Sequence, residues 1–254
     1  SRYLWRFKKR IYDQIPDLQI VALSSWMHQQ LAQSSLLSEK TVTRLPNLID
    51  TTVFRPVDRG AARDAVGVPG HATVLMFSAV KATSDFNKGY DLLMGALRSI
   101  WKRDLWILIV GGDVSRRYRV GNTTILEFGH IRETDRIVTL YNVADAVVVP
   151  SRIENLSNTI MESLACGTPT VAFDAGGNRD LIEHRRNGYL AEPYDTKDLL
   201  AGIQYIIDTG ARGGDLRQRA RMSVETRYSF RAKTKDYVHL YESIGANRSA
   251  FSKD

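Results

Sequence analysis

The sequence contains a single cysteine among its 254 residues, Cys166. One cysteine excludes an internal disulfide and favours a reducing compartment. No apolar run approaches the roughly 20 residues that a membrane-spanning helix needs. The opening segment SRYLWRFKKRIY lacks the apolar core of a secretory signal peptide. Zinc-finger spacing and the aromatic strands of RNA-binding domains are also missing, so nucleic acid is not an expected partner.

What the sequence does contain is an ordinary globular composition with an excess of basic charge. Hydrophobic residues make up 43% and charged residues 25%, and the chain is long enough to bury a sizeable core. The net charge of +7 suits anionic partners such as lipid surfaces or phosphorylated substrates. Basic and aromatic residues alternate between Arg2 and Tyr12, so this segment is amphipathic. Its two interpretations are contact with a membrane surface and, as the favoured one, a helix packed on another domain.

Strands and helices alternate from His71 onward. Apolar runs typical of buried strands occur at 73–77, 105–110, 124–128, 146–149, 170–173 and 189–191. Helices with an apolar stripe are expected at 90–100, 135–142 and 195–208, and one more between Ser157 and Gly167. This alternation predicts an α/β fold, with a doubly wound parallel sheet and helices on both faces. Two consecutive helices, broken near Tyr228 and Ser229, are expected within 215–245.

The first part of the chain has the pattern with which an α/β domain ends. A strand is expected at 18–23, a helix capped by Ser24 and Ser25 at 26–33, and a short strand at 41–45. Residues 50–68 are expected to form a linker and an approach helix. Cys166 lies at the end of an apolar helical stripe, so a buried structural thiol is favoured over a nucleophile.

Two glutamates flank the start of the helix that Ser157 caps. Glu154 lies in the loop after a strand, and Glu162 lies inside the helix. Ligands of open α/β sheets bind at the carboxyl ends of the strands. The free amides of Asn158 and Thr159 at the helix start favour an anion there. A phosphate with a carboxylate on each side suits a nucleotide-sugar, in which hydroxyl groups flank a diphosphate.

The whole arrangement is more specific than the two glutamates alone. It runs from a strand through Pro150-Ser151, a glutamate, a helix and a second glutamate to Gly167-Thr168-Pro169 and Gly176-Gly177. It resembles the glutamate, seven residues, glutamate motif of the retaining family 4 glycosyltransferases. In that family the motif lies in the half of the GT-B fold that binds the nucleotide-sugar donor. The resemblance implies transfer of a sugar to an acceptor hydroxyl with retention and without a bound metal.

The resemblance also implies a role for each residue of the motif. Glu162 would accept hydrogen bonds from the ribose hydroxyls, and Glu154 would bind hydroxyls of the transferred sugar. The other expected elements are the phosphate-binding amides of Asn158 and Thr159 and the pocket wall at Gly176 and Gly177. A hydrolytic role for the glutamates is disfavoured, because Glu162 would lie beneath the helix start rather than across a cleft from Glu154.

Lys88 is the expected cation for the diphosphate, where it would stabilise the negative charge of the leaving group. Most relatives carry Gly-Arg and then Lys-Gly a few positions later, whereas this chain has Ser78-Ala79 in place of Gly-Arg. Lys81 would substitute for the arginine from a shifted position. The alternative for both lysines is a solvated loop side chain, and it is the favoured one for Lys81.

The turn Gly129-His130-Ile131 follows a strand and is similar to the family's base-binding turn. His130 or Ile131 would meet the nucleobase through backbone groups and ring packing. A plain loop histidine is an equal alternative for His130. The departures Asn155 and Ser157 stand where many relatives have glycine, and Leu48 replaces a glycine of the linker.

Residues 46–245 are therefore expected to be the nucleotide-sugar-binding half of a GT-B glycosyltransferase. Residues 1–45 would be a remnant of the acceptor-side half, and 246–254 a polar, frayed tail. The expected donor is a UDP-sugar, with a GDP-sugar as the alternative and no other cofactor. The acceptor would be a glycan or lipid-linked molecule in polysaccharide synthesis, in the cytoplasm or at the inner face of a membrane. A sugar-nucleotide epimerase and a catalytically silent nucleotide-binding module remain alternatives.

Overall fold

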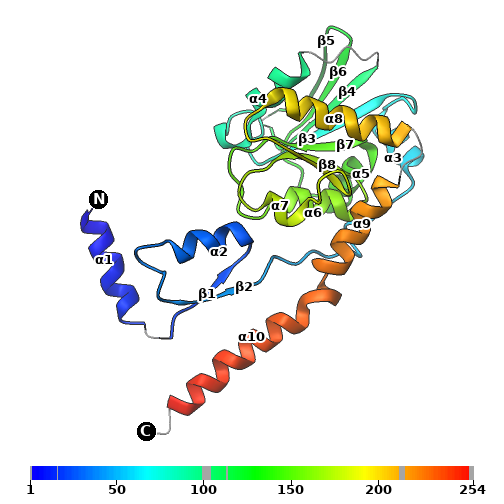
Figure 1. Cartoon of the computed structure of the whole chain (residues 1–254). Helices are drawn as coiled ribbons and strands as arrows, with labels where there is room; N and C mark the ends of the chain where they lie inside the picture. Colours follow the sequence, from blue (N-terminus) through cyan, green and yellow to red (C-terminus); the bar gives the residue numbers. More distant parts are fainter. Residues whose placement is uncertain (1, 16, 99–103, 113, 212–214, 252–254) are drawn as a thin grey trace.

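The computed structural model describes residues 2–15, 17–98, 104–112, 114–211 and 215–251. Its largest part is a seven-stranded sheet in the order β5-β6-β4-β3-β7-β8-β9, with helices on both faces (Figure 1). A two-stranded parallel sheet, β1-β2, lies apart from this sheet in the first part of the chain. The predicted α/β architecture with a doubly wound sheet is confirmed.

The parallel strands of the large sheet lie at or within a residue of the predicted positions. They are β3 (Thr73–Ser78), β4 (Leu105–Val110), β6 (Thr123–Phe128), β7 (Ala146–Val149), β8 (Thr170–Phe173) and β9 (Gly188–Ala191). Strands β4, β7 and β8 are buried along their whole length, because helices cover both of their faces.

Strand β5 (Arg116–Val120) was not predicted, and it makes the sheet mixed, since it pairs antiparallel with β6. Its sequence RRYRV has no apolar run that would indicate a buried strand. Its side chains instead bind one carboxylate on β6. Arg116 Nε lies 2.7 Å from Glu127 Oε2, and Tyr118 donates a hydrogen bond to Glu127 Oε1 at 2.7 Å.

Two hydrophobic clusters, one on each face, hold the helices to the sheet. Helices α3 (Arg59–Val66), α5 (Thr134–Val143), α6 (Asn158–Ala165) and α9 (Leu216–Arg227) pack on one face. Helices α4 (Tyr90–Leu97) and α8 (Thr196–Ala211) pack on the other. The short helix α7 (Asn178–Leu181) follows β8. The α4 prediction reached residue 100, and residues 99 and 100 lie outside the described residues.

Cys166 ends α6 and is fully buried, which agrees with the prediction of a buried structural thiol. Burial raises the pKa of its thiol to about 12. The thiol therefore stays protonated at neutral pH, and a protonated thiol is a poor nucleophile.

The first part of the chain forms α1 (Arg2–Asp13), β1 (Gln19–Ala22), α2 (Ser25–Ala32) and β2 (Thr41–Arg44). Ser24 caps α2 as predicted, since its Oγ accepts a hydrogen bond from Met27 N at 3.1 Å. Helix α1 buries none of its residues. Among the described helices, none has the length and apolar character needed to cross a bilayer.

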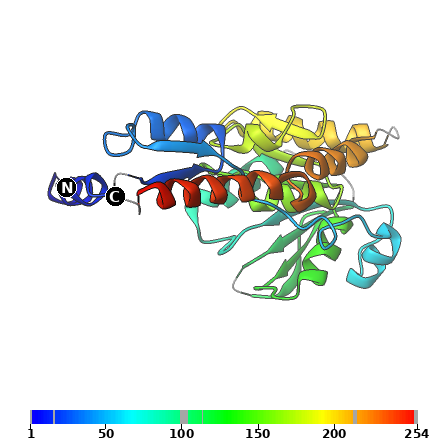
Figure 2. The same ribbon diagram turned by 90° about the horizontal axis from the view of Figure 1, so that it is seen from below.

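Helix α10 (Phe230–Phe251) runs from the large sheet toward the first part of the chain (Figures 1 and 2). Tyr237 on this helix donates a hydrogen bond to Pro46 O at 2.9 Å. The helix continues to Phe251, and residues 252–254 of the predicted tail lie outside the described residues. Residues 246–251 contain neither glycine nor proline that would end the helix. The frayed tail at 246–254 stays a prediction.

Candidate active site

The start of α6 lies at the carboxyl edge of the sheet, after β7 and its loop. Ser157 caps the helix as predicted, since its Oγ accepts a hydrogen bond from Ile160 N at 3.4 Å. The amides of Asn158 and Thr159 belong to the first turn, where a helix has no internal acceptors for its N–H groups. The positive end of the helix dipole adds to their effect. This helix start therefore has the geometry of an anion-binding site.

Lys88 and Glu154, the two predicted catalytic residues, meet in an ion pair. Lys88 ends a short 3₁₀ turn, η1 (Phe86–Lys88), and Glu154 lies in the loop after β7. Lys88 Nζ lies 2.8 Å from Glu154 Oε1. The Lys88 side chain is 29% exposed and that of Glu154 is 14% exposed, so both groups remain partly accessible at the sheet edge. The structure therefore brings together two residues that are 66 positions apart.

Close packing between two loops explains why this ion pair forms. Arg152 N donates a hydrogen bond to Asn87 O at 2.8 Å, which joins the loop after β7 to the η1 turn. Gly89 has a φ of +70°, and a Cβ there would lie 2.0 Å from Pro150 O. Glycine alone allows this approach, because it has no Cβ and tolerates positive φ. The turn that carries Lys88 is thus held against the loop that carries Glu154.

Gly176 and Gly177 support the Glu154 loop from its other side. A Cβ on Gly176, whose φ is +60°, would lie 1.8 Å from Glu154 O, and one on Gly177 would lie 1.8 Å from Asn155 O. Gly177 N donates a hydrogen bond to Glu154 O at 2.9 Å. These two glycines let their own turn approach the backbone of the Glu154 loop closely, and their predicted place in a ligand pocket stays a prediction. They build the wall behind Glu154.

Asn155, which stands where many relatives have glycine, binds the first part of the chain. Ser24 Oγ donates a hydrogen bond to Asn155 Oδ1 at 3.0 Å, and Ser25 N donates one to Asp180 Oδ2 at 2.5 Å. The sequence indicated Ser24 only as a helix cap. Nothing in a local pattern reveals its contact with Asn155, which is 131 positions away.

Glu162 is half-buried and held by a tyrosine that the sequence did not single out. Tyr141 on α5 donates a hydrogen bond to Glu162 Oε2 at 2.8 Å, and its side chain is buried. Burial raises the pKa of Glu162 above its ordinary value, and the bond from Tyr141 partly opposes this. Tyr141 lies on an apolar helical stripe with Val138, so its sequence position indicates a core residue. The hydrogen bond fixes one oxygen of the carboxylate, and the other has no side-chain or backbone partner in the described part of the chain.

A cavity of about 280 Å³ lies beside Glu162. Asn158, Met161 and Glu162 line it from α6, and linker residues Asn47, Leu48 and Ile49 and α10 residue Tyr237 line it from the other side. Asn47 Nδ2 donates a hydrogen bond to Asn158 Oδ1 at 3.3 Å. The linker therefore contacts the first turn of α6 directly.

The remaining predicted binding residues lie around this edge of the sheet. Lys81 is exposed on the loop after β3, in keeping with the solvated interpretation. His130 is also exposed, after β6. The contact of His130 or Ile131 with a nucleobase stays a prediction, and the Ile131 side chain is 8% exposed and belongs to the hydrophobic core. Ile131 has only its backbone groups to offer a ligand.

Comparison with known proteins places the chain in a family. The family model "Glycosyl transferases group 1" matches residues 72–209. D-inositol 3-phosphate glycosyltransferase of Saccharomonospora viridis is 29% identical over 218 residues, which cover 79% of this chain and 50% of the relative. The chain thus spans about half the length of the curated relatives that it matches.

Solved structures show the same fold. Sucrose-phosphate synthase from Thermosynechococcus elongatus superposes with a TM-score of 0.79 at 22% identity, covering 94% of this chain and 62% of that one. Anabaena Alr3699/HepE, solved in complex with UDP and glucose, has a TM-score of 0.73 at 20% identity and covers 89% and 63%. The fold is therefore that of GT-B glycosyltransferases, as predicted. Because the family model covers more than half of its residues, this chain belongs to the group 1 glycosyl transferases.

Proposed function

We propose that residues 46–245 form the donor-binding half of a retaining glycosyltransferase, and that residues 1–45 belong to the acceptor-side half. The observation that carries the proposal is the meeting of Lys88 and Glu154 beside the start of α6, with Glu162 one turn farther along the helix. These groups lie at the carboxyl edge of the sheet, where open α/β sheets bind ligands.

The proposed donor is a nucleotide diphosphate-sugar. Its diphosphate lies at the amides of Asn158 and Thr159, and its ribose hydroxyls donate hydrogen bonds to Glu162. A UDP-sugar is the first candidate, because the similar HepE was solved with UDP and glucose. A GDP-sugar is the alternative. The nucleobase lies at the turn of His130 and Ile131.

In the reaction the bond between the sugar's anomeric carbon and the diphosphate oxygen breaks as the acceptor oxygen bonds to that carbon, and the proton of the acceptor hydroxyl passes to the leaving diphosphate. Negative charge then collects on the leaving diphosphate, and the α6 start and Lys88 stabilise it. The Lys88 ammonium has three N–H groups, so one can stay on Glu154 while another binds a phosphate oxygen. The second oxygen of Glu154 accepts from a sugar hydroxyl. No step in this scheme requires a metal ion.

The proposed acceptor is a hydroxyl group of a sugar or an inositol phosphate. The name of the relative from Saccharomonospora viridis supports a phosphorylated polyol.

Stereochemistry tests the proposed reaction on the full-length protein. With a UDP-sugar labelled with ¹³C at the anomeric carbon, NMR should show a product of the same anomeric configuration as the donor. An inverted product contradicts retention, and an isomerised donor sugar without transfer indicates an epimerase.

Lys88→Ala should weaken the binding of the diphosphate group without affecting the binding of the nucleoside. Loss of one charge-assisted hydrogen bond is expected to weaken UDP binding roughly tenfold. Uridine has no phosphate, so its affinity should stay unchanged. Isothermal titration of both compounds measures this difference, and Lys235→Ala, at an exposed position of α10, serves as the matched lysine control. Equal losses for UDP and uridine would show that Lys88 does not bind the diphosphate.

A further inference from the structure

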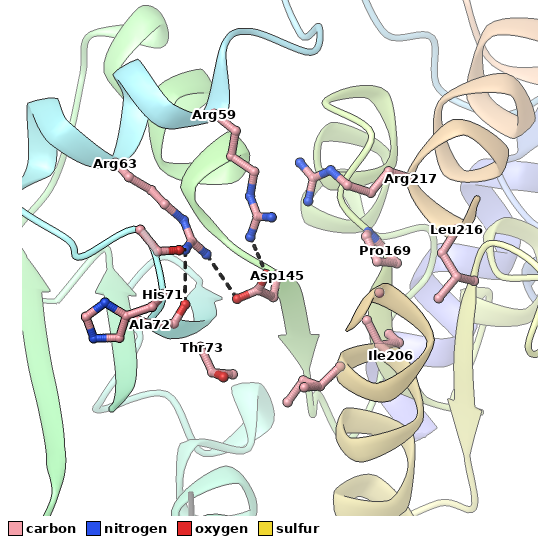
Figure 3. Close-up of a pocket in the computed structure, with 13 residues that line it drawn as sticks. Arg59, Arg63, His71, Ala72, Thr73, Asp145, Pro169, Ile206, Leu216 and Arg217 are labelled. Carbon is pink, nitrogen blue, oxygen red and sulfur yellow. Dashed lines mark hydrogen bonds and ion pairs between the residues drawn. The ribbon is translucent and has the colours of Figure 1, made fainter. Parts of the chain in front are cut away.

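A separate pocket of about 320 Å³ lies at the opposite edge of the sheet (Figure 3). Its lining includes Thr73 at the start of β3, Asp145 before β7 and Pro169 before β8. These are amino ends of parallel strands, whereas Lys88 and Glu154 lie beyond the carboxyl ends. The pocket is therefore distinct from the proposed donor site.

Positive charge exceeds negative charge among the described residues that line this pocket. Arg59 and Arg63 reach it from α3, where both contact the single carboxylate of Asp145, and Arg217 reaches it from α9 (Figure 3). His71, which also lines the pocket, has its Nε2 3.7 Å from the exposed Asp104 carboxylate. With His71 neutral, the lining has three positive charges and one negative charge.

Asp145 is fully engaged by other partners. Its Oδ1 pairs with Arg59, while its Oδ2 accepts hydrogen bonds from Arg63 Nη2 at 3.1 Å and from Val74 N at 2.7 Å. Arg217 forms its described hydrogen bonds elsewhere, to Ala144 O at 3.0 Å and Thr168 Oγ1 at 3.0 Å. The one carboxylate therefore does not neutralise the cluster.

Arg63 has a structural role that explains its own burial. Its guanidinium donates to Val143 O at 3.3 Å, Gly70 O at 2.6 Å and Ala72 O at 3.0 Å. Its side chain is 6% exposed. These bonds tie α3 to the start of the sheet, so Arg63 has little capacity left for a ligand.

Arg59 and Arg217 do not form the set of three backbone hydrogen bonds that gives Arg63 its structural role. Arg59 Nε is buried and has no hydrogen-bond partner among the described residues, which is uncommon for a buried N–H group. Burial and, after it, the positive charge of Arg59 lower the pKa of Arg217 to about 10. Arg217 extends from α9 toward Arg59 (Figure 3). Both groups thus lie in a site whose one carboxylate, Asp145, leaves an excess of positive charge.

We propose that Arg59 and Arg217 bind a phosphate dianion or a phosphate monoester. Two planar guanidinium groups match the oxygens of a phosphate, and two negative charges balance the excess charge of the pocket. Ile206 and Leu216 give the pocket an apolar wall for the carbon part of a small ester. The inference does not rest on the proposed donor site.

Titration calorimetry with inorganic phosphate and with glycerol phosphate tests the site. The wild-type chain should bind at least one of them, and Arg59→Gln should weaken that binding about tenfold. Arg231→Gln removes the same charge from an exposed position on α10 and should leave binding unchanged. The proposal is overturned if neither compound binds the wild-type chain, or if Arg59→Gln binds as tightly as the control.

A second measurement locates the phosphate without any substitution. In ¹⁵N-resolved NMR spectra of the wild-type chain, phosphate should shift the amide signals of Ala72 and Thr73 at the pocket. Shifts confined to Asn158 and Thr159 would place the phosphate at the α6 start and overturn the proposal.

Discussion

Replacing Gly176 with alanine is expected to lower the free energy of unfolding by roughly 2–4 kcal/mol. The added Cβ would lie 1.8 Å from Glu154 O, a backbone atom that no side-chain rotation can move away. The φ of +60° adds strain, because residues with a Cβ disfavour the left-handed region. For a domain of this size the melting temperature should fall by roughly 5–15 °C.

Thermal unfolding followed by circular dichroism measures this effect. Gly245→Ala is the matched control, since Gly245 lies in exposed helix α10 and a Cβ there meets no atom within 4 Å. The control should be neutral or stabilise the helix by up to about 1 kcal/mol. If Gly176→Ala has the same melting temperature as the control, the turn of Gly176 and the Glu154 loop are not packed as closely as the structure shows.

The sequence predicted those parts of the fold and site that depend on neighbouring residues. The cap at Ser157 and the apolar stripe of α6 are local signals, and the helix lies where they place it. Strand β7 was likewise predicted to the residue from its apolar run. The meeting of a carboxyl-end loop with a helix start follows from the topology of a parallel sheet.

Contacts between distant residues could not be predicted in the same way. Strand β5 is held by a carboxylate of β6, Glu127. The sequence position of Tyr141 indicates only a core residue, and its hydrogen bond to Glu162 is known only from the structure. The glycine at position 176 indicates that another group packs closely against the backbone there, but the sequence does not say whether that group is a ligand or the Glu154 loop. The arginine pocket is assembled from Arg59 and Arg217, which are far apart in the chain, and no local pattern joins them.

Glu162→Ala should have the largest effect on nucleotide binding. Hydrogen bonds to a charged acceptor contribute about 1.5–3 kcal/mol, so UDP affinity is expected to fall roughly 10- to 100-fold. The substitution also leaves the buried Tyr141 hydroxyl without its described acceptor, which lowers stability. Tyr141→Phe combined with Glu162→Ala removes that unpaired hydroxyl and separates the two effects.

The measurement that tests the proposed donor site most directly is therefore a calorimetric titration of UDP into three proteins: wild type, Tyr141→Phe, and the Tyr141→Phe, Glu162→Ala double variant. The wild type should bind UDP, and Tyr141→Phe should bind it with similar affinity because Glu162 remains. The double variant should bind roughly 10- to 100-fold more weakly while still folding. Wild-type affinity in the folded double variant would contradict the assignment of Glu162 to the ribose, and no UDP binding by the wild type would contradict the donor site itself.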